Sequence, residues 1–279
     1  MDLDRRPAVY AAGNDTCDDW QRAVLRSIGA MRDDLGYEHS LRSLARSAWL
    51  SPFHFHRIFQ RVTDSTPARF LAAWRMAEAK RLLVYSDVSV TDICMQIGYS
   101  SLGTFTSQFT RMVGVSPGRF RRLLATASGR SFQDVLAGLA IRLTPPVRPQ
   151  VTVIVEGGPG EPALAAVGLF PSGIPQRTPD ACAVIAVPGS GILGDLPDGE
   201  YHPLAMCFAN AVTVAEAVAT AEPERCFVAA YGRPVEVFGG RAEPATVRLR
   251  LRPRRETDPP LVLAMPLLAA AEPAAEPVA

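Results

Sequence analysis

Two segments of the chain, one about 50 residues after the other, carry the same pattern of apolar and turn-forming residues. Phe55, Phe59, Arg61, Pro67 and Phe70 recur as Phe105, Phe109, Arg111, Pro117 and Phe120. Upstream, Leu44 and Ala45 correspond to Ile93 and Cys94 at a spacing of 49. Each copy predicts a short helix, a tight turn and a second helix, with Gly98 as the left-handed turn residue of the second copy. The chain is therefore expected to build one helix-turn-helix unit twice.

Further helix signals surround and join the two copies. Apolar spacing predicts helices over residues 18–32, 41–48 and 67–85, and cap residues predict others that begin near Ser51, Ser89, Ser101 and Ser116. A joining helix over 67–85 is roughly 28 Å long at 1.5 Å per residue. With its flanking helices it would hold the two second helices roughly 34 Å apart, which is one turn of B-DNA. These signals predict a seven-helix all-α domain over 18–127, after a flexible N-terminal tail over 1–17.

The net charge of +1 hides an asymmetry between the two halves. Residues 1–130 hold 18 Lys+Arg against 12 Asp+Glu, so this segment carries +6 and the remainder carries −5. A basic segment joined to an acidic one indicates that only the first half faces a polyanion.

Several protein classes are excluded. The five cysteines lie far apart with no Cys-x-x-Cys spacing, which argues against a disulfide framework, a zinc site or another metal site. No apolar run reaches the roughly 18 residues of a membrane helix, and the N-terminus lacks a secretory signal. We expect a cytoplasmic protein with no membrane contact, no metal and no cofactor.

The second half of the sequence differs from the first in its pattern of apolar residues. Residues 128–149 contain a Pro-rich extended stretch and are expected to be a linker. Beyond it, short apolar runs between Gly/Pro clusters predict strands over 151–155, 163–170, 182–187, 201–208, 226–230, 235–238, 246–251 and 261–265. These runs predict an all-β, antiparallel, sandwich-like domain over 150–270, followed by a disordered tail over 271–279. The Gly189–Gly194 stretch matches GxGxxG without a following helix, so it is interpreted as a hairpin loop.

Both halves resemble known families. The stretches from Leu44 to Phe59 and from Ile93 to Arg121, with Thr66-Pro67 between them, resemble the AraC/XylS family of transcription regulators. This resemblance implies a sequence-specific double helix-turn-helix domain over about 18–125, although most family members carry it at the C-terminus. Val167–Phe170 and 198–205 resemble a transthyretin- or carboxypeptidase-regulatory-type β-sandwich.

The AraC resemblance places base-reading positions on the exposed face of each second helix. They are Phe53, His56, Arg57 and Gln60 in the first copy, and Gly103, Thr106, Ser107 and Thr110 in the second. Arg57 is the best candidate for a bidentate contact to guanine, while Phe53 either packs on a thymine methyl or staples the helix start. The family commonly has Arg where this chain has Ser107, and short hydroxyls mainly reach phosphates. We therefore expect the first copy to dominate specificity.

Arginines near both copies are candidate phosphate contacts. They are Arg61, Arg75, Arg111, Arg119, Arg121 and Arg122, each of which has a solvated surface charge as its alternative interpretation.

The predicted function is a sequence-specific DNA-binding transcription regulator that reads two successive major grooves of double-stranded DNA and is not an enzyme. Three roles compete for the second half: binding a small-molecule effector, forming a homodimer, or contacting RNA polymerase. A pocket lined by Phe170, Tyr201, Phe208, Phe227 or Tyr231 would favour an effector, although sandwich core is the alternative for each of these aromatics. The alternative function is a small-molecule-binding protein or enzyme whose β domain carries the main activity. No constellation of catalytic residues stands out in 150–270.

Overall fold

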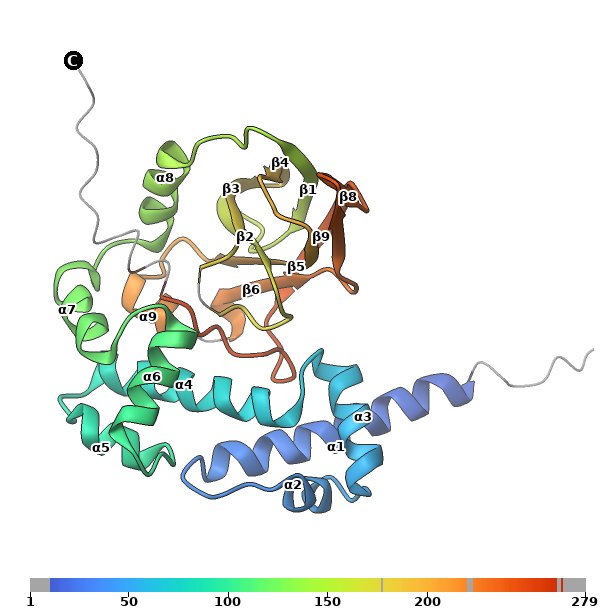
Figure 1. Cartoon of the computed structure of the whole chain (residues 1–279), viewed down its shortest axis with the longest axis vertical. Coiled ribbons are helices and arrows are strands. Elements are labelled where there is room, and N and C mark those ends of the chain that lie inside the picture. Colours follow the sequence, from blue (N-terminus) through green and yellow to red (C-terminus); the bar gives the residue numbers. More distant parts are fainter. Residues whose placement is uncertain (1–10, 177, 220–222, 265–266, 268–279) are drawn as a thin grey trace, which may run out of the picture.

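The computed structural model describes residues 11–176, 178–219, 223–264 and 267. Helices form the first part and a curved sheet forms most of the second, which packs directly on the helices (Figure 1). The helices of the first part are α1 (Ala11–Asp33), α2 (Leu41–Ser47), α3 (Pro52–Thr63), α4 (Pro67–Tyr85), α5 (Val90–Gln96), α6 (Leu102–Val113) and α7 (Pro117–Ala127). None of the described helices is both long enough and apolar enough to cross a membrane.

The sequence repeat is a structural repeat. In the first copy the rings of Phe55, Phe59 and Phe70 meet edge to face, with centroids 5.4 and 5.3 Å apart. In the second copy the rings of Phe105, Phe109 and Phe120 do the same at 5.6 and 5.8 Å. All six are fully buried, so each unit is built around an aromatic stack that fixes its second helix against the following one.

The two turns share one backbone conformation but differ in sequence. The amide of Leu50 donates to the carbonyl of Ala45, as that of Tyr99 donates to the carbonyl of Cys94. The left-handed position is Gly98 at φ 83° in the second copy and Trp49 at φ 61° in the first. Position 98 requires glycine, because a Cβ atom there would lie 2.8 Å from the carbonyl oxygen of Leu35.

Two expectations for the ends of the helical part were wrong. Helix α1 begins at Ala11, so residues 11–17 of the expected flexible tail are helical, and residues 1–10 lie outside the described part of the chain. The expected linker over 128–149 contains helix α8 (Phe132–Arg142), which packs on the sheet through Phe132 and Leu136. Its N-cap is Ser131, a signal that the neighbouring Pro-rich stretch obscured.

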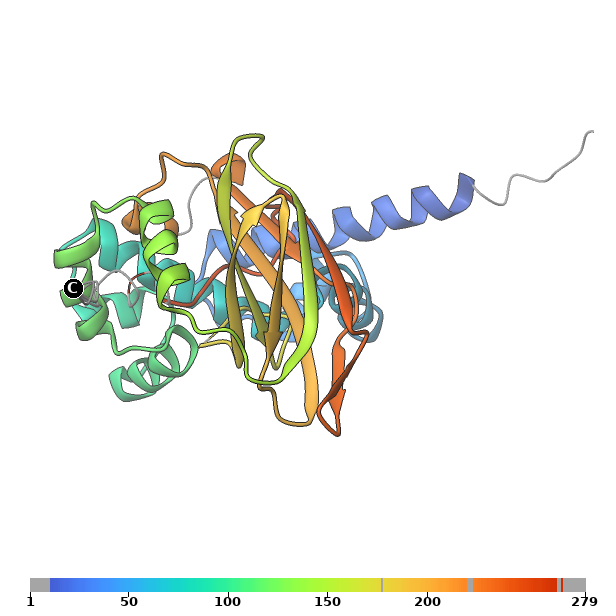
Figure 2. The same cartoon turned by 90° about the horizontal axis from the view of Figure 1, so that it is seen from above.

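The second part is one sheet that curls almost into a barrel. Its strands are β1 (Pro149–Gly157), β2 (Ala163–Phe170), β3 (Ala181–Val187), β4 (Gly189–Gly194), β5 (Gly199–Phe208), β6 (Cys226–Ala230), β7 (Val235–Phe238), β8 (Arg241–Glu243) and β9 (Thr246–Pro253). The main order is β3-β2-β5-β6-β9-β1-β4, with β7 and β8 attached at β5. The end strands β3 and β4 contact each other, and the strands surround a common interior (Figure 2).

This arrangement corrects the expected antiparallel sandwich in five respects. One curved sheet replaces two packed sheets, and β1 pairs with β9 in parallel. The Gly-rich stretch expected as a hairpin loop is strand β4, paired along β1. The described residues of the predicted strand over 261–265 form no strand. The second part is not all-β, because it contains helix α9 (Val214–Val218).

The two parts share a hydrophobic core. Val262, Ala264 and Leu267, which follow the last strand, are buried among the core residues of the second helix-turn-helix unit. The amide of Ala264 donates to the carbonyl of Val113 at 3.0 Å. Residues 261–264 and 267, hereafter the C-terminal strap, therefore complete the core beneath α4.

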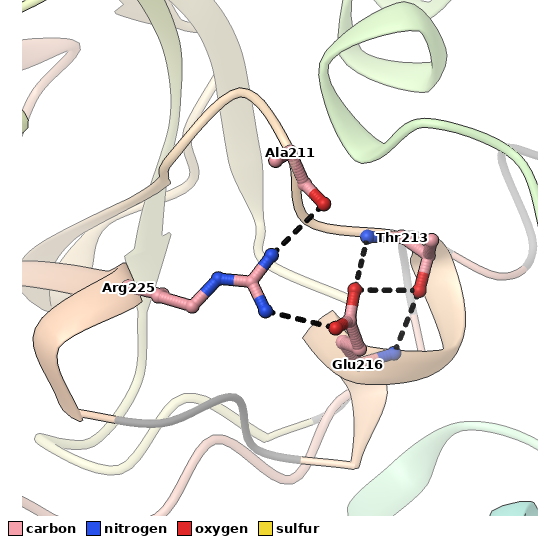
Figure 3. Close-up of polar contacts among 4 residues, drawn as sticks. All are labelled: Ala211, Thr213, Glu216 and Arg225. Carbon is pink, nitrogen blue, oxygen red and sulfur yellow. Dashed lines mark hydrogen bonds and ion pairs between the residues drawn. The ribbon is translucent and has the colours of Figure 1, made fainter.

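Helix α9 adds a second connection between the parts. Val214 and Val218 lie in the same core as the strap, and the amide of Ala215 donates to the carbonyl of Ser128 after α7. A capping box between Thr213 and Glu216 and a 2.9 Å ion pair from Glu216 to Arg225 fix this short helix (Figure 3). The hydrogen bonds from Thr213 lower the pKa of the Glu216 carboxyl, so the box is retained at neutral pH.

Lys80, the single lysine of the chain, is fully buried where the strap meets α4. Its Nζ donates to the carbonyl oxygen of Leu261 at 2.7 Å. Burial without a counter-charge disfavours the ammonium form and lowers the pKa of Lys80 to about 7.

We expect the free energy of unfolding to rise with pH above about 7, the lowered pKa of Lys80. Below that value the side chain is protonated in the folded and unfolded chains alike. Between there and the ordinary value of 10.5, the folded chain has released a proton that the unfolded chain still binds. The slope from this group is at most about 1.4 kcal/mol per pH unit.

Urea unfolding of the full chain and of Lys80→Met, at several pH values between about 6.5 and 8.5, measures this dependence. The slope should be present in the parent and absent in the variant. Equal slopes in the two proteins would show that Lys80 keeps its ordinary pKa in the folded chain.

Candidate nucleic-acid interface

Helix α3 is held so that one face is buried and the other is open. Pro52 occupies the first helical position after Ser51, and Asp64 ends the helix in the left-handed conformation at φ 51°. Phe55, Ile58 and Phe59 are fully buried, while Val62 is partly buried. The buried stripe follows the 3.6-residue period, so the positions between its members face outward.

The predicted reading residues of α3 lie on this outward face. Phe53 is 81% exposed, and Arg57 and Gln60 are also exposed, whereas His56 is partly buried. The guanidinium of the exposed Arg61 lies 5.1 Å from the centre of the ring of Trp20 on α1, within the range of a cation–π contact. An 81% exposed phenylalanine has no core contact to explain it, so the staple interpretation of Phe53 is not supported by its burial.

Helix α6 presents a smaller and less charged face. Gly103, Ser107, Thr110 and Arg111 are exposed, and Thr106 is partly buried. The hydroxyl of Thr110 donates to the carbonyl of Thr106 at 2.7 Å, which leaves its oxygen only as an acceptor. Arg111 donates to the side chain of Gln108 at 2.6 Å. The two outward faces therefore differ in chemistry although their backbones repeat.

Two of the six candidate phosphate arginines are engaged inside the fold. Arg75 donates to the carbonyl oxygens of Leu35 and Tyr37, both at 3.0 Å. Arg121 donates to the carbonyl oxygen of Val88 at 2.7 Å. These two side chains hold loops that follow α1 and α4. Arg61, Arg111, Arg119 and Arg122 are exposed and stay candidates.

Sequence reasoning missed a basic group beside the N-terminus of α3. Arg42 and Arg46, one turn apart on α2, line a shallow groove together with Trp49 and Pro52. Both arginines are exposed, and the Ser51 side chain makes no capping bond to α3. The signal was the spacing of four between Arg42 and Arg46, just ahead of the turn. The groove combines cations with uncapped amides of a helix N-terminus, a combination suited to phosphate.

The described residues contain no group of three His, Cys, Asp or Glu side chains able to hold a metal ion. Burial raises the pKa of the thiols of Cys94, Cys182, Cys207 and Cys226, so these thiols are protonated at neutral pH. The chemistry available on the surface of α3 and α6 is hydrogen bonding and ion pairing.

Comparison with known proteins agrees with this geometry. Residues 44–123 match the model of a family described as helix-turn-helix domain. Over 105 residues the chain is 30% identical to an uncharacterized HTH-type transcriptional regulator, YbfP, of Bacillus subtilis, with 38% of this chain and 36% of the relative covered. Over 84 residues it is 30% identical to the bifunctional transcriptional activator/DNA repair enzyme AdaA of the same organism, with 30% and 40% covered.

A solved structure is also similar to the first part. The DNA-binding domain of the global transcriptional factor AdpA, in complex with a target DNA, has 28% identity and a TM-score of 0.35, with 37% of this chain and 92% of that chain covered.

The chain spans well under two thirds of the length of these two relatives. Most of the related proteins are transcription regulators, and the sheet of the second part is not assigned to a family. Residues 44–123 form an AraC-type helix-turn-helix DNA-binding domain.

Proposed function

We propose that this chain regulates transcription by binding double-stranded DNA sequence-specifically through α3 and α6. The observation that carries the proposal is the duplicated unit with one outward helix in each copy, joined by the single helix α4. In this proposal residues 18–127 bind DNA, 128–149 connect the parts, and 150–270 serve sensing or association. The DNA-bound chain then recruits or blocks RNA polymerase.

The joining helix supports binding to two successive major grooves. Helix α4 has 19 residues, and α3 and α6 lie toward its opposite ends (Figure 1). Its length of about 28 Å, extended by the flanking turns, suits the roughly 34 Å repeat of B-DNA. The residues that would enter the grooves are Phe53, His56, Arg57, Gln60 and Arg61 on α3, and Gly103, Thr106, Ser107, Thr110 and Arg111 on α6.

In this proposal α3 and α6 have different roles in binding DNA. Arg57 has the length and the planar donor pair to contact guanine bidentately, whereas Ser107 at the corresponding position is too short for such a contact. The first unit thus supplies most base discrimination. The second unit adds backbone affinity and fixes the register.

A second candidate function belongs to the sheet. A cavity between the sheet and the helices favours binding of a small molecule by the second part.

Arg57→Ala should lose about 1–3 kcal/mol of discrimination at one base pair, equivalent to roughly 5- to 150-fold in the ratio of dissociation constants. Ser107→Ala should change discrimination by less than about threefold. The measurement is fluorescence anisotropy of the full chain on a site selected from random DNA and on its single-base variants. Arg241→Ala, an exposed arginine on the distant strand β8, serves as the matched control. Equal loss of discrimination in Arg57→Ala and Ser107→Ala would contradict the proposed asymmetry.

The salt dependence of binding should report the candidate arginines that are exposed at the surface. Six phosphate contacts, four from the remaining candidates and two from Arg42 and Arg46, predict that log K falls with log[salt] at a slope of about −5, and Arg119→Ala should reduce its magnitude by about 0.9. Arg121→Ala should leave the slope unchanged and lower the melting temperature, because its guanidinium binds the Val88 carbonyl. A slope reduced equally by both substitutions would place Arg121 on the DNA.

A further inference from the structure

A cavity of about 200 Å³ lies between the outer face of the sheet and the helical part. Its floor is formed by side chains that point away from the interior of the barrel, on neighbouring strands. Gly168 on β2 pairs with Cys182 on β3 and with Leu204 on β5, and Leu204 pairs in turn with Ala230 on β6. Because these residues lie directly beside one another on adjacent strands, they form one continuous surface.

Small residues on this floor create the hollow. Ala166 and Ala230 leave space that Leu or Val would fill at the same positions. Gly168 is required in addition by close packing, since a Cβ atom there would lie 2.7 Å from the ring of Phe170. Phe170 is one of the five aromatics considered as pocket residues from the sequence, and it alone among them lines this cavity.

The walls come from three other segments. Leu139 and Leu143 belong to α8 or follow it, and Leu261 and Leu263 belong to the C-terminal strap. Val62, Thr63 and Asp64 come from the end of the recognition helix α3. The cavity is enclosed by separate elements on several sides, so its size admits a small molecule and not a helix or strand of a partner.

The lining defines the chemistry of the ligand. Most of the lining surface is carbon, and its four charged residues, Asp64, Arg252, Arg255 and Asp258, carry no net charge. Arg252 contacts both carboxylate oxygens of Asp258 at 2.7 Å. An apolar cavity of 150 Å³ in another protein accommodates benzene, so 200 Å³ is suited to one or two rings. Ligand sites with apolar walls and few polar groups are typical of small-molecule pockets.

We propose that this cavity binds a small, neutral, largely apolar molecule and couples that binding to the two recognition helices. The coupling half of this proposal rests on the proposed DNA-binding function, whereas the binding half does not.

The β2–β3 loop is the first route of coupling. It lines the cavity through Gly173 and Pro175. A Cβ atom at Gly173 would lie 3.2 Å from the carbonyl oxygen of Asp64, so the loop touches the end of α3. Ile174 is buried in the core of the second unit, and Gln176 shares a small hollow with Arg111 of α6. One loop thus contacts the ligand cavity and both recognition units.

The C-terminal strap is the second route. Leu261 and Leu263 face the cavity, whereas Val262 and Ala264 between them are buried in the core that supports α6. A ligand that displaces the two leucines would also shift the two alternate residues. Both routes connect the cavity to the relative placement of α3 and α6.

The binding half is tested with N-phenyl-1-naphthylamine, a neutral fluorescent probe, and with 8-anilino-1-naphthalenesulfonate, its sulfonated analogue, on the full chain. We expect saturable binding of the neutral probe at one site, with weaker binding of the sulfonate. Ala166→Leu and, separately, Ala230→Leu should weaken binding of the neutral probe at least about tenfold by filling the floor.

Ala186→Leu, on an exposed position of β3 outside the cavity, is the matched control and should bind like the parent. Circular dichroism confirms that each variant is folded. Absence of saturable binding to the parent, or equal binding by parent and both filled variants, would overturn the proposed site.

The coupling half is tested by titrating the neutral probe with and without saturating DNA. Because coupling is reciprocal, the probe affinity should differ at least about threefold between the two conditions. Equal affinities would overturn the coupling. A chain that binds no DNA but still binds the probe would refute the proposed function and leave the site established.

Discussion

Burial of the C-terminal strap against the underside of α4 is the constraint on which the rest of the structure depends. Val262, Ala264 and Leu267 occupy the core of the second helix-turn-helix unit, and Lys80 is buried to reach the strap carbonyl. Because burial disfavours the ammonium form, the pKa of Lys80 falls to about 7, so both forms of the side chain occur near neutral pH. The two halves of the chain therefore stabilise each other through one apolar core, and the sheet is not an independent appendage.

This shared core changes how the DNA-binding part is understood. A duplicated unit with its own aromatic stacks looks self-sufficient, since Phe55, Phe59 and Phe70 pack among themselves in the first copy. The second copy instead takes Ile174 from the β2–β3 loop and Val214 from α9 into its core. The second unit, which we propose contributes less base discrimination, is thus the one whose packing depends on the second half. A signal from the sheet would reach the DNA through the placement of α6.

The sequence predicted the helical part well because local signals agree there. Serine or threonine caps, prolines at first helical positions and the buried stripe of α3 all depend on neighbours within a few residues. Prediction was wrong where long-range contacts decide. The apolar segment 261–264 has the composition of a strand, but it packs on helices and not in the sheet. Gly189–Gly194 has the composition of a loop, but pairing with β1 makes it a strand.

The same distinction applies to the interface residues. The AraC resemblance placed Phe53, Arg57 and Gln60 on the outward face of α3, in agreement with the helical period, and they are exposed. The sequence could not show that Arg119 is exposed while Arg121 is engaged in the fold, because the carbonyl that Arg121 binds is 33 residues away. Arg42 and Arg46 escaped notice because their relevance depends on the groove they form with Trp49. Whether a side chain can contact DNA depends on its neighbours in the folded structure, and the amino-acid composition does not show these neighbours.

The central claim is that α3 and α6 of one chain read two grooves on one face of the duplex. Selection of bound sequences from random DNA by the full chain, followed by binding to sites with altered spacing, tests it most directly. The account predicts two short determinants separated by about 10 base pairs, and a large loss of affinity when about five base pairs are inserted between them. A single short determinant, or affinity that is indifferent to the insertion, would contradict it.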